Sequence, residues 1–294
     1  MSEETKKGRI GFVVDGVADI PPQIIAELGN IKTVPFHIEF GQQSYVEGVD
    51  MSYDEFYRRL SLPNEVIPKT QCPSPGEYLT TYQEMLGRYD KIISMHASSK
   101  MTGAMGAAEV ARKMLPDADI TLVDSTTVSM VLGLYAIQAA RAAKAGAEAS
   151  QILSQIKTEM NGTFALFTSA TLKYIRHSGR VGLAGYLLGS MLRIKPLFTF
   201  KDGVGQSAGR EMNSDAAYLR IAKAAAAQFG DKPVIAAIVH SVAPDDAAKL
   251  KARAEQFLNL KELIVSELGP TLGVHGGPGT VGMGAFAAEA SQIA

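Results

Sequence analysis

KIISMHASSKMTGAMGAAEVARKML, residues 91–115, is the stretch that decides the fold class of this chain. Its apolar beginning is typical of a buried strand, and its Ala-rich end has the spacing of a helix. The loop between them carries the hydroxyls of Ser98, Ser99 and Thr102. The first N–H groups of a helix have no partner within the helix, and the helix dipole favours negative charge there. The stretch therefore predicts a strand that leads into a helix, with either an anion site or ordinary capping residues at the junction.

The composition excludes several classes of protein. The chain has 294 residues, of which 46% are hydrophobic, enough for one large domain or two smaller ones. Its formal net charge of -1 gives no sign of a nucleic-acid partner. A single cysteine, Cys72, excludes an internal disulfide and is typical of a reducing compartment. The polar N-terminus has no signal-peptide core, and the longest apolar run, residues 128–140, is too short to cross a bilayer. We expect a cytoplasmic protein without integral membrane association.

The first half of the chain alternates strand-like and helix-like segments. Residues 9–15 are typical of a buried parallel strand that ends in the carboxylate of Asp15. Residues 31–40 read as a second strand that passes into a hairpin, and residues 120–125 as a later one that contains Asp124. The βαβα period predicts a mostly parallel sheet with helices on both faces.

The second half has a different pattern. Residues 164–167 and 194–200 are strand-like, and Asp202-Gly203 is a hairpin signal. The predicted helices of this half cover residues 172–176, 183–192, 216–229 and 245–257, and two further strands cover residues 234–239 and 262–265. The fold class is therefore α/β, with a parallel α/β domain over residues 1–161 and a smaller α/β domain with a mixed sheet over residues 162–294.

Two short glycine motifs lack the context that their chemistry requires. Residues 277–282 satisfy G-x-G-x-x-G, but the chain ends before the βαβ unit and acidic residue of a dinucleotide site. Residues 205–209 satisfy G-x-S-x-G, but they lie on the returning arm of a predicted hairpin and not at a strand-to-helix elbow. No pair of histidines has metal-ligand spacing on one helix. We expect neither a cofactor nor a metal.

Other polar residues have two open interpretations each. Asp15 and Asp124 end parallel strands on the side where α/β sheets bind ligands, and each could serve a site or cap the next helix. Cys72 could line a site or be a buried inert thiol. The histidines expected to be structural are His37, His96, His177 and His240. The arginines that could hold a phosphate or an acidic partner, or simply lie in a solvated loop, are Arg176, Arg180 and Arg193.

Several short motifs follow one another along the chain in a characteristic order. They are VD (residues 14–15), ADIP (18–21), TQCPSP (70–75), SSKMTG (98–103), DS (124–125), GRV (179–181), IKP (194–196) with DG (202–203), and HGGPG (275–279). Their order resembles the DegV family, whose members bind fatty acids, and the resemblance covers nearly the whole chain. It implies a parallel α/β first domain and a fatty acid buried between two domains.

The resemblance also implies which residues hold the carboxylate. Carried over to this chain, the head-group residues are Thr70, Thr102, Gly103 and His275, with Arg180 as a neighbouring cation. Hydroxyls and helix-end N–H groups are the partners that a buried carboxylate needs. The acyl chain needs only an apolar slot, because each buried CH₂ contributes about 0.8 kcal/mol. Candidates for its lining, with ordinary core packing as the favoured interpretation of each, are Phe36, Phe164, Leu166, Met191 and Phe198.

Four motifs depart from the family's usual form. Gly16-Val17 stands where the family has Ser-Thr, Gln71-Cys72 where it has Ser-Gln, Ala104 where it has Thr, and Ser178 where it has Gly. Thr102 keeps the hydroxyl of the Ser-Gly-Thr motif. These departures leave open a different acyl chain or a different acidic lipid as the ligand.

We therefore predict a lipid carrier without catalysis of its own. By resemblance, it shields a long-chain fatty acid and presents the carboxylate to a separate fatty acid kinase. The alternative is a small-molecule hydrolase or phosphotransferase that uses His275 as base or nucleophile. A sensor of a different ligand is a third interpretation.

Overall fold

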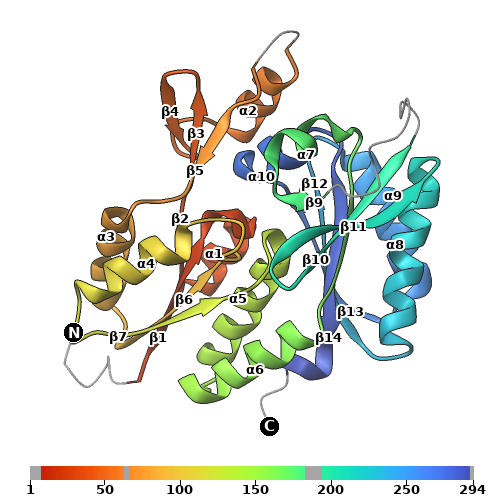
Figure 1. The fold of residues 1–294 in the computed structure, drawn as a ribbon. Coiled ribbons are helices and arrows are strands. Elements are labelled where there is room, and N and C mark those ends of the chain that lie inside the picture. The colour runs from red at the N-terminus through yellow and green to blue at the C-terminus, as the bar shows by residue number, and fades with distance from the viewer. Residues whose placement is uncertain (1–7, 63–65, 183–193, 292–294) are drawn as a thin grey trace.

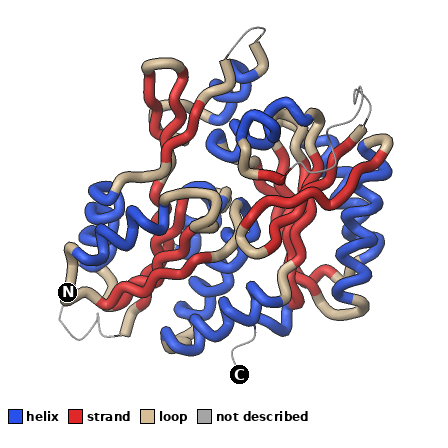
Figure 2. The backbone as a smooth tube through the Cα atoms, in the orientation of Figure 1, coloured by secondary structure: helices blue, strands red, loops and turns tan. Residues whose placement is uncertain are grey.

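The computed structural model describes residues 8–62, 66–182 and 194–291. Within these ranges the chain forms two main sheets, a small third sheet and the helices that cover them (Figure 1). Figure 2 shows the main sheets side by side with helices between and outside them. The α/β fold class predicted from the sequence is confirmed.

The first main sheet is entirely parallel, in the order β2-β1-β6-β7. Its strands are β1 (Ile10–Asp15), β2 (Ile31–Val34), β6 (Lys91–His96) and β7 (Asp119–Asp124). Its helices are α1 (Pro22–Leu28), α3 (Pro75–Leu86), α4 (Ala104–Lys113) and α5 (Ser129–Lys144), with the 3₁₀ helix η2 (Gly16–Ala18) after β1. The predicted strand, loop and helix over residues 91–115 are β6, its following loop and α4.

The second main sheet is mixed, and in the described ranges it has the order β13-β12-β14-β8-β10-β11-β9. Its strands are β8 (Phe164–Thr168), β9 (Val181–Gly182), β10 (Lys195–Lys201), β11 (Val204–Glu211), β12 (Val234–His240), β13 (Leu260–Glu267) and β14 (Val281–Ala287). The accompanying helices are α6 (Ala149–Asn161), α7 (Leu172–Ser178), α8 (Ser214–Phe229), α9 (Pro244–Phe257), α10 (Pro270–Gly276) and the 3₁₀ helix η3 (Ala288–Ser291). The predicted helix over residues 183–192 lies outside the described residues.

The third sheet corrects one expectation. Residues 31–40 do not form one strand, because Pro35 has no N–H to donate and the chain leaves the first sheet there. The chain then enters the sheet β4-β3-β5, whose strands are β3 (His37–Phe40), β4 (Gln43–Val46) and β5 (Lys69–Gln71). Helix α2 (Tyr53–Leu60) packs against it, and its N-cap Ser52 accepts a hydrogen bond from the backbone N–H of Glu55.

Helix α5 connects the two main sheets. It contacts β1 and β6 of the first sheet and β12 and β14 of the second, and all of its residues from Ser129 to Ala140 are buried. One hydrophobic cluster accordingly includes residues of both sheets. The long apolar run of the sequence is therefore a helix that is buried on every side.

Each main sheet draws its strands from one side of residue 161. Helix α5, from the N-terminal side, nevertheless covers one face of the second sheet. The division into domains at Asn161 and Gly162 stays a prediction.

Gly133 lets α5 pack closely against η2, which follows strand β1. A Cβ atom at this position would lie 2.6 Å from the carbonyl oxygen of Ala18, a backbone atom that cannot move aside. We predict that Gly133→Ala lowers the free energy of unfolding by about 1–3 kcal/mol through overpacking. Gly106 in α4 is the control, because it has nothing within 4 Å of its Cβ position. Gly106→Ala should raise stability by about 0.5–1 kcal/mol, and equal denaturation midpoints for the two variants would refute the prediction.

Candidate ligand pocket between the sheets

A cavity of about 620 Å³ lies at the carboxyl end of the first sheet, where it meets the second. It lies beyond the ends of β1 and β6, which is where open α/β sheets bind ligands. Most of its wall is apolar: Val17, Phe36, Ala97, Met101, Val128, Phe167, Ile175, Val181, Phe198, Phe200, Leu268 and Leu272. Its polar lining residues include Thr70, Gln71, Cys72, Ser99, Thr102, Thr168, Ser169, Arg180, Thr271 and His275.

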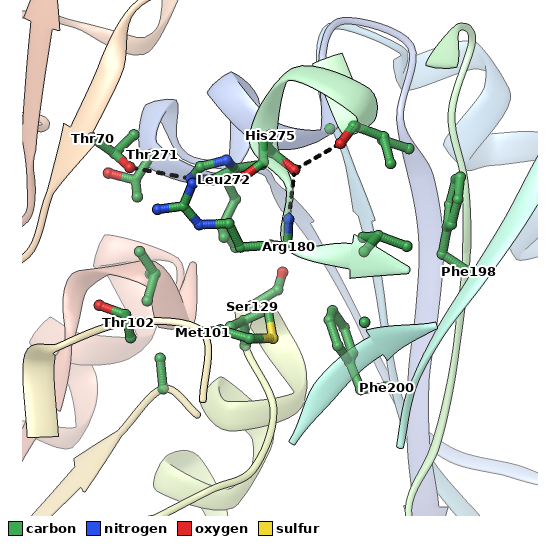
Figure 3. A pocket seen from close by; sticks show the side chains of 18 of the residues that line it. Thr70, Met101, Thr102, Ser129, Arg180, Phe198, Phe200, Thr271, Leu272 and His275 are labelled. Atoms are coloured by element: carbon green, nitrogen blue, oxygen red, sulfur yellow. Dashed lines mark hydrogen bonds between the residues drawn. The ribbon is translucent and has the colours of Figure 1, made fainter. Parts of the chain in front are cut away.

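The pocket brings together the five predicted head-group residues. Thr70 lies on β5 and His275 on α10, and Thr70 Oγ1 lies 3.1 Å from His275 Nε2. Figure 3 shows Arg180 beside this pair and Thr102 on another wall of the pocket. Gly103, the N-cap of α4, completes the set. Residues more than 200 positions apart in sequence are therefore neighbours here.

Arg180 follows the left-handed Gly179 that ends α7. Its Nη1 donates to the carbonyl oxygen of Ser178 at 2.6 Å, which holds the guanidinium against the pocket. None of the ion pairs among the described residues involves Arg180. The guanidinium can therefore receive an anionic ligand.

The environment of His275 keeps its imidazole neutral. Burial, followed by the positive charges of Arg180 and His177, lowers the pKa of His275 from 6.5 to about 4. Its Nδ1 atom is buried and has no hydrogen-bond partner in the described part of the chain, and the same is true of Thr168 Oγ1. His275 therefore offers a ligand hydrogen bonds, and the cations of the lining are Arg180 and Lys100, whose Nζ donates to the carbonyl oxygen of Asp202.

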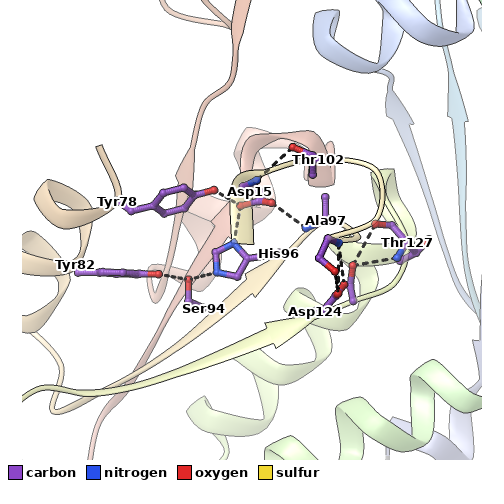
Figure 4. A network of polar contacts seen from close by, with 12 residues as sticks. Asp15, Tyr78, Tyr82, Ser94, His96, Ala97, Thr102, Asp124 and Thr127 are labelled. Atoms are coloured by element: carbon purple, nitrogen blue, oxygen red, sulfur yellow. Dashed lines mark hydrogen bonds and ion pairs between the residues drawn. The ribbon is translucent and has the colours of Figure 1, made fainter. Parts of the chain in front are cut away.

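A buried polar network positions the pocket floor. Asp15 accepts hydrogen bonds from Tyr78 Oη at 2.5 Å, His96 Nδ1 at 2.9 Å and Ala97 N at 2.8 Å (Figure 4). Asp15 and His96 are both fully buried. Because Ala97 lines the pocket, Asp15 fixes the start of the floor loop, residues 97–103. Asp15 makes no side-chain cap and does not line the pocket, so its role is to anchor this loop.

The floor loop has two further anchors. Asp124 accepts a hydrogen bond from Ser99 Oγ at 2.5 Å. Ser98 Oγ donates to the carbonyl oxygen of Gly203, in the turn between β10 and β11, at 2.6 Å. The loop is thereby attached both to its own sheet and to the second sheet.

Three residues of this network are arranged like a catalytic triad, but a substrate has no access to them. Ser94 Oγ lies 2.9 Å from His96 Nε2, and His96 Nδ1 contacts Asp15. All three side chains are fully buried and lie outside the pocket lining, and Tyr82 donates its hydroxyl hydrogen to Ser94. A substrate cannot reach this serine. In the pocket itself, His275 Nδ1 has no carboxylate partner among the described residues to orient it as a base.

The structure separates the candidates for the tail lining. Phe36 and Phe198 line the pocket, whereas Phe164 and Leu166 follow the favoured interpretation and pack in the core. Alternate residues of β8 point to opposite faces, and these two pack in the cluster beneath α8. Phe167 points the other way, and its ring centroid lies 5.4 Å from that of Phe200. The remaining candidate, Met191, lies outside the described residues, as does Arg193.

Sequence reasoning missed several lining residues. Thr168, Ser169 and Thr271 contribute polar groups. Phe200 had an available signal, because it is two residues from Phe198 on a predicted strand and so shares its face. Cys72 lines the pocket and is a free thiol.

The described residues contain no group of three His, Cys, Asp or Glu side chains that could hold a metal. Among the helices that the structure describes, none has the length and apolarity needed to cross a membrane.

The fold and the pocket together define a class: α/β proteins in which two sheets enclose an apolar cavity with a polar end. Residues 9–288 match the model of a family described as "Uncharacterised protein, DegV family". The chain belongs to the DegV family.

Relatives and solved structures resemble the chain over nearly its full length. A DegV domain-containing protein from Streptomyces coelicolor is 32% identical over 276 residues, which are 93% of this chain and 97% of that protein. A Thermus thermophilus structure described as fatty acid binding of a DegV family protein has a TM-score of 0.87 at 29% identity, and covers 95% of this chain and 99% of its own. Bacillus subtilis DegV, described as a fatty acid binding protein, has a TM-score of 0.84 at 26% identity, with coverage of 96% and 100%.

The neutral state of His275 gives a testable pH dependence. Because folding lowers its pKa from 6.5 to about 4, the folded state binds fewer protons than the unfolded chain between these values. The stability that this provides is complete above pH 6.5 and is lost as the pH falls towards 4. We predict that the imidazole NMR signals of His275 stay constant from pH 8 to about 5.5. A titration midpoint near 6.5, as in the unfolded chain, would show that the imidazole is not buried as described.

Proposed function

We propose that the chain binds a long-chain fatty acid, or a similar acyl lipid, in the pocket between its sheets. The acyl chain lies along the apolar wall, and Thr70, Thr102, Gly103, Arg180 and His275 hold the carboxylate. The observation that carries the proposal is the chemistry of the pocket: it is mostly apolar, and its polar lining has a guanidinium without an ion-pair partner and an imidazole nitrogen without a hydrogen-bond partner among the described residues. The fatty-acid binding described for the Thermus thermophilus and Bacillus subtilis proteins supports it.

The physical balance favours an acid with a long apolar chain. Burial of a carboxylate is costly unless charged or polar groups receive it, and Arg180 with the threonine hydroxyls would do so. Each buried CH₂ then contributes about 0.8 kcal/mol. A short acid would bear the same desolvation cost with little of this gain.

The proposal includes an organisation and a partner. We propose domains over residues 1–161 and 162–294, with the ligand between them, in a cytoplasmic carrier that has no catalysis of its own. Arg180 is an exposed residue that also lines the pocket, so the carboxylate end lies near the surface. This position suits presentation of the carboxylate to a separate fatty acid kinase, the partner that the family resemblance implies.

Of the departures from the family motifs, Gln71 and Cys72 line the pocket, whereas Gly16 and Ala104 do not. Gly16 allows close approach to Pro35, since a Cβ atom there would lie 3.0 Å from the Cα of Pro35. Ala104 is fully buried at the start of α4, where a hydroxyl would need a partner. Thr102 Oγ1 accepts a weak hydrogen bond from the N–H of Ala104 at 3.4 Å and remains on the pocket side.

Two substitutions test the head-group assignment. Thr70→Val and Thr102→Val remove hydroxyls from the pocket and leave the size of the side chain nearly unchanged. A hydrogen bond to a charged group contributes about 1.5–3 kcal/mol, so each variant should bind oleate about ten- to a hundredfold more weakly. Native mass spectrometry after purification without added lipid should show a stoichiometric acyl chain on the wild type and less on either variant.

Thr158→Val is the matched control for these variants. Thr158 is exposed on α6, away from the pocket, and its hydroxyl donates to the carbonyl oxygen of Ser154. The control should retain the wild-type acyl content. Wild-type affinity in both pocket variants would overturn the head-group assignment, whereas an empty wild-type protein that takes up no fatty acid would overturn the proposed function.

The only cysteine reports directly on occupancy of the pocket. Cys72 lines the cavity, and its Sγ atom lies 3.4 Å from the Cβ position of Gly103. We predict that saturating oleate slows alkylation of Cys72 by N-ethylmaleimide at least tenfold, because the chain covers the thiol. The unfolded protein in denaturant gives the unprotected rate. If Cys72 of the folded protein were alkylated at the same rate with and without saturating oleate, the acyl chain would lie elsewhere.

A further inference from the structure

Two buried carboxylates meet where three parts of the fold join. Asp19 follows η2 at the end of β1, Glu47 follows β4 of the small sheet, and Gly269 precedes α10. Both acidic residues are buried. A Cβ atom built on Gly269 would lie 2.3 Å from Glu47 Oε1 and 3.0 Å from Asp19 Oδ1, so the two carboxylates converge on the start of α10.

Each carboxylate holds this helix by hydrogen bonds. Asp19 Oδ1 accepts from Gly269 N at 2.9 Å, and Asp19 Oδ2 accepts from Ser129 Oγ at 2.6 Å. Glu47 Oε2 accepts from Thr271 Oγ1 at 2.5 Å. Thr271 and Ser129 line the pocket, and α10 carries His275. The pair therefore connects the first sheet and the small sheet to the helix that forms one side of the ligand site.

The backbone at this junction is also unusual. Asp19 and Ser129 both have left-handed backbone conformations, with φ of 52° and 60°. Such conformations are uncommon for residues other than glycine and persist where surrounding contacts impose them. The hydrogen bond between their side chains is such a contact.

No cation compensates the pair within the described residues. Neither Asp19 nor Glu47 forms an ion pair there. The titratable groups that face them are acids and phenols: Tyr53 and Tyr57 from α2 and Glu267 at the end of β13, with Asp54 acting on Glu267. Helix α5 contributes only the neutral hydroxyl of Ser129. Two negative charges at this position would have only the neutral donors of Ser129, Gly269 and Thr271 as partners, and no cation among the described residues.

Burial therefore favours the neutral acids. Burial raises the pKa of Asp19 from 3.8 to about 8, which outweighs the lowering by the hydrogen bonds from Ser129 and Gly269, and the charge of Glu47 adds to the rise. Burial likewise raises the pKa of Glu47 from 4.5 to about 7 against the hydrogen bonds from Thr271. If α10 moved away and water entered, both carboxyl groups would regain ordinary acidity and lose their protons. Opening thus releases protons, and by linkage a rising pH favours it.

We propose that Asp19 and Glu47 form an acid latch, which holds α10 against the pocket while both are protonated and releases it when both are charged. Ligand release would accordingly become faster as the pH rises, a consequence that rests on the proposed fatty-acid binding. Each proton lost on opening multiplies the open fraction by up to about ten for each pH unit. The open fraction rises with pH between the ordinary pKa values of the two acids and their raised values in the folded protein, and it levels off above about pH 8.

The test measures release of cis-parinaric acid, a fluorescent fatty acid, by stopped flow from pH 5.5 to 9.5. We expect the wild-type release rate to rise at least tenfold between pH 6 and 8 and then to level off. The double variant Asp19→Asn with Glu47→Gln keeps the shapes of both side chains and should show a flat profile. Asparagine also tolerates the left-handed backbone at position 19.

Glu159→Gln is the matched control. Glu159 on α6 is also buried, and burial raises its pKa from 4.5 to about 7. It contacts Gln155 and Ser291 and does not line the pocket. This variant should keep the pH dependence of release seen in the wild type. The ligand's own ionisation is the same in all variants, so a wild-type slope in the double variant would overturn the latch.

Hydrogen exchange of the ligand-free wild type tests the latch independently. The amides of Gly273 and Gly277 donate to the carbonyl oxygens of Gly269 and Gly273 and report on the integrity of α10. After correction for intrinsic exchange, their protection should fall between pH 6 and 8, whereas that of β12 amides should stay constant. Constant α10 protection would refute the latch even if the double variant failed to fold. Absence of parinarate binding with falling α10 protection would instead refute the proposed function and support the latch.

Discussion

The burial of helix α5 is the constraint on which the rest of the structure depends. An apolar helix with buried residues on every side requires a sheet on each face, and α5 has β1 and β6 on one side and β12 and β14 on the other. Its N-terminus, at Ser129, lies at the carboxyl ends of the first sheet's strands. Beyond this point the pocket is lined by residues of both sheets and by Ser129 of α5 itself, among them Ala97 after β6 and Phe167 on β8. The helix that holds the sheets together therefore also forms part of the pocket wall.

The polar groups in and around the pocket have different roles because they are buried to different degrees. A histidine this deeply placed beside Arg180 stays neutral, so it can form hydrogen bonds but cannot neutralise an anion. Arg180 is an exposed residue that lines the pocket, and its planar guanidinium can receive a carboxylate. Asp15 uses its side-chain oxygens in three hydrogen bonds within the protein, and these fix the floor loop. One anionic ligand can thus be received without an unpaired charge in the apolar wall.

Sequence patterns predicted what depends on local spacing. The strand, loop and helix over residues 91–115, the parallel first sheet and the polar residues carried over from the family motifs all have local signals. The choice of face on β8 could not be predicted, because both faces of this strand are buried and no polar residue marks one of them. Strand β14 was missed because its glycines weaken the strand pattern. Those glycines have a tertiary purpose: a Cβ atom on Gly282 would meet the ring of Phe167, and one on Gly284 would meet Val131.

Contacts between distant segments were beyond any sequence pattern. Asp19 and Glu47 each look like an ordinary loop acid, and their meeting at α10 depends on elements that are more than 220 residues away along the chain. Helix α10 contacts α2, β3 and β5 on one side and α7 on the other, and along the chain it connects β13 to β14 of the second main sheet. The small sheet, which the sequence did not reveal as a separate unit, is the part of the fold that joins the pocket's polar residue Thr70 to the helix that carries His275.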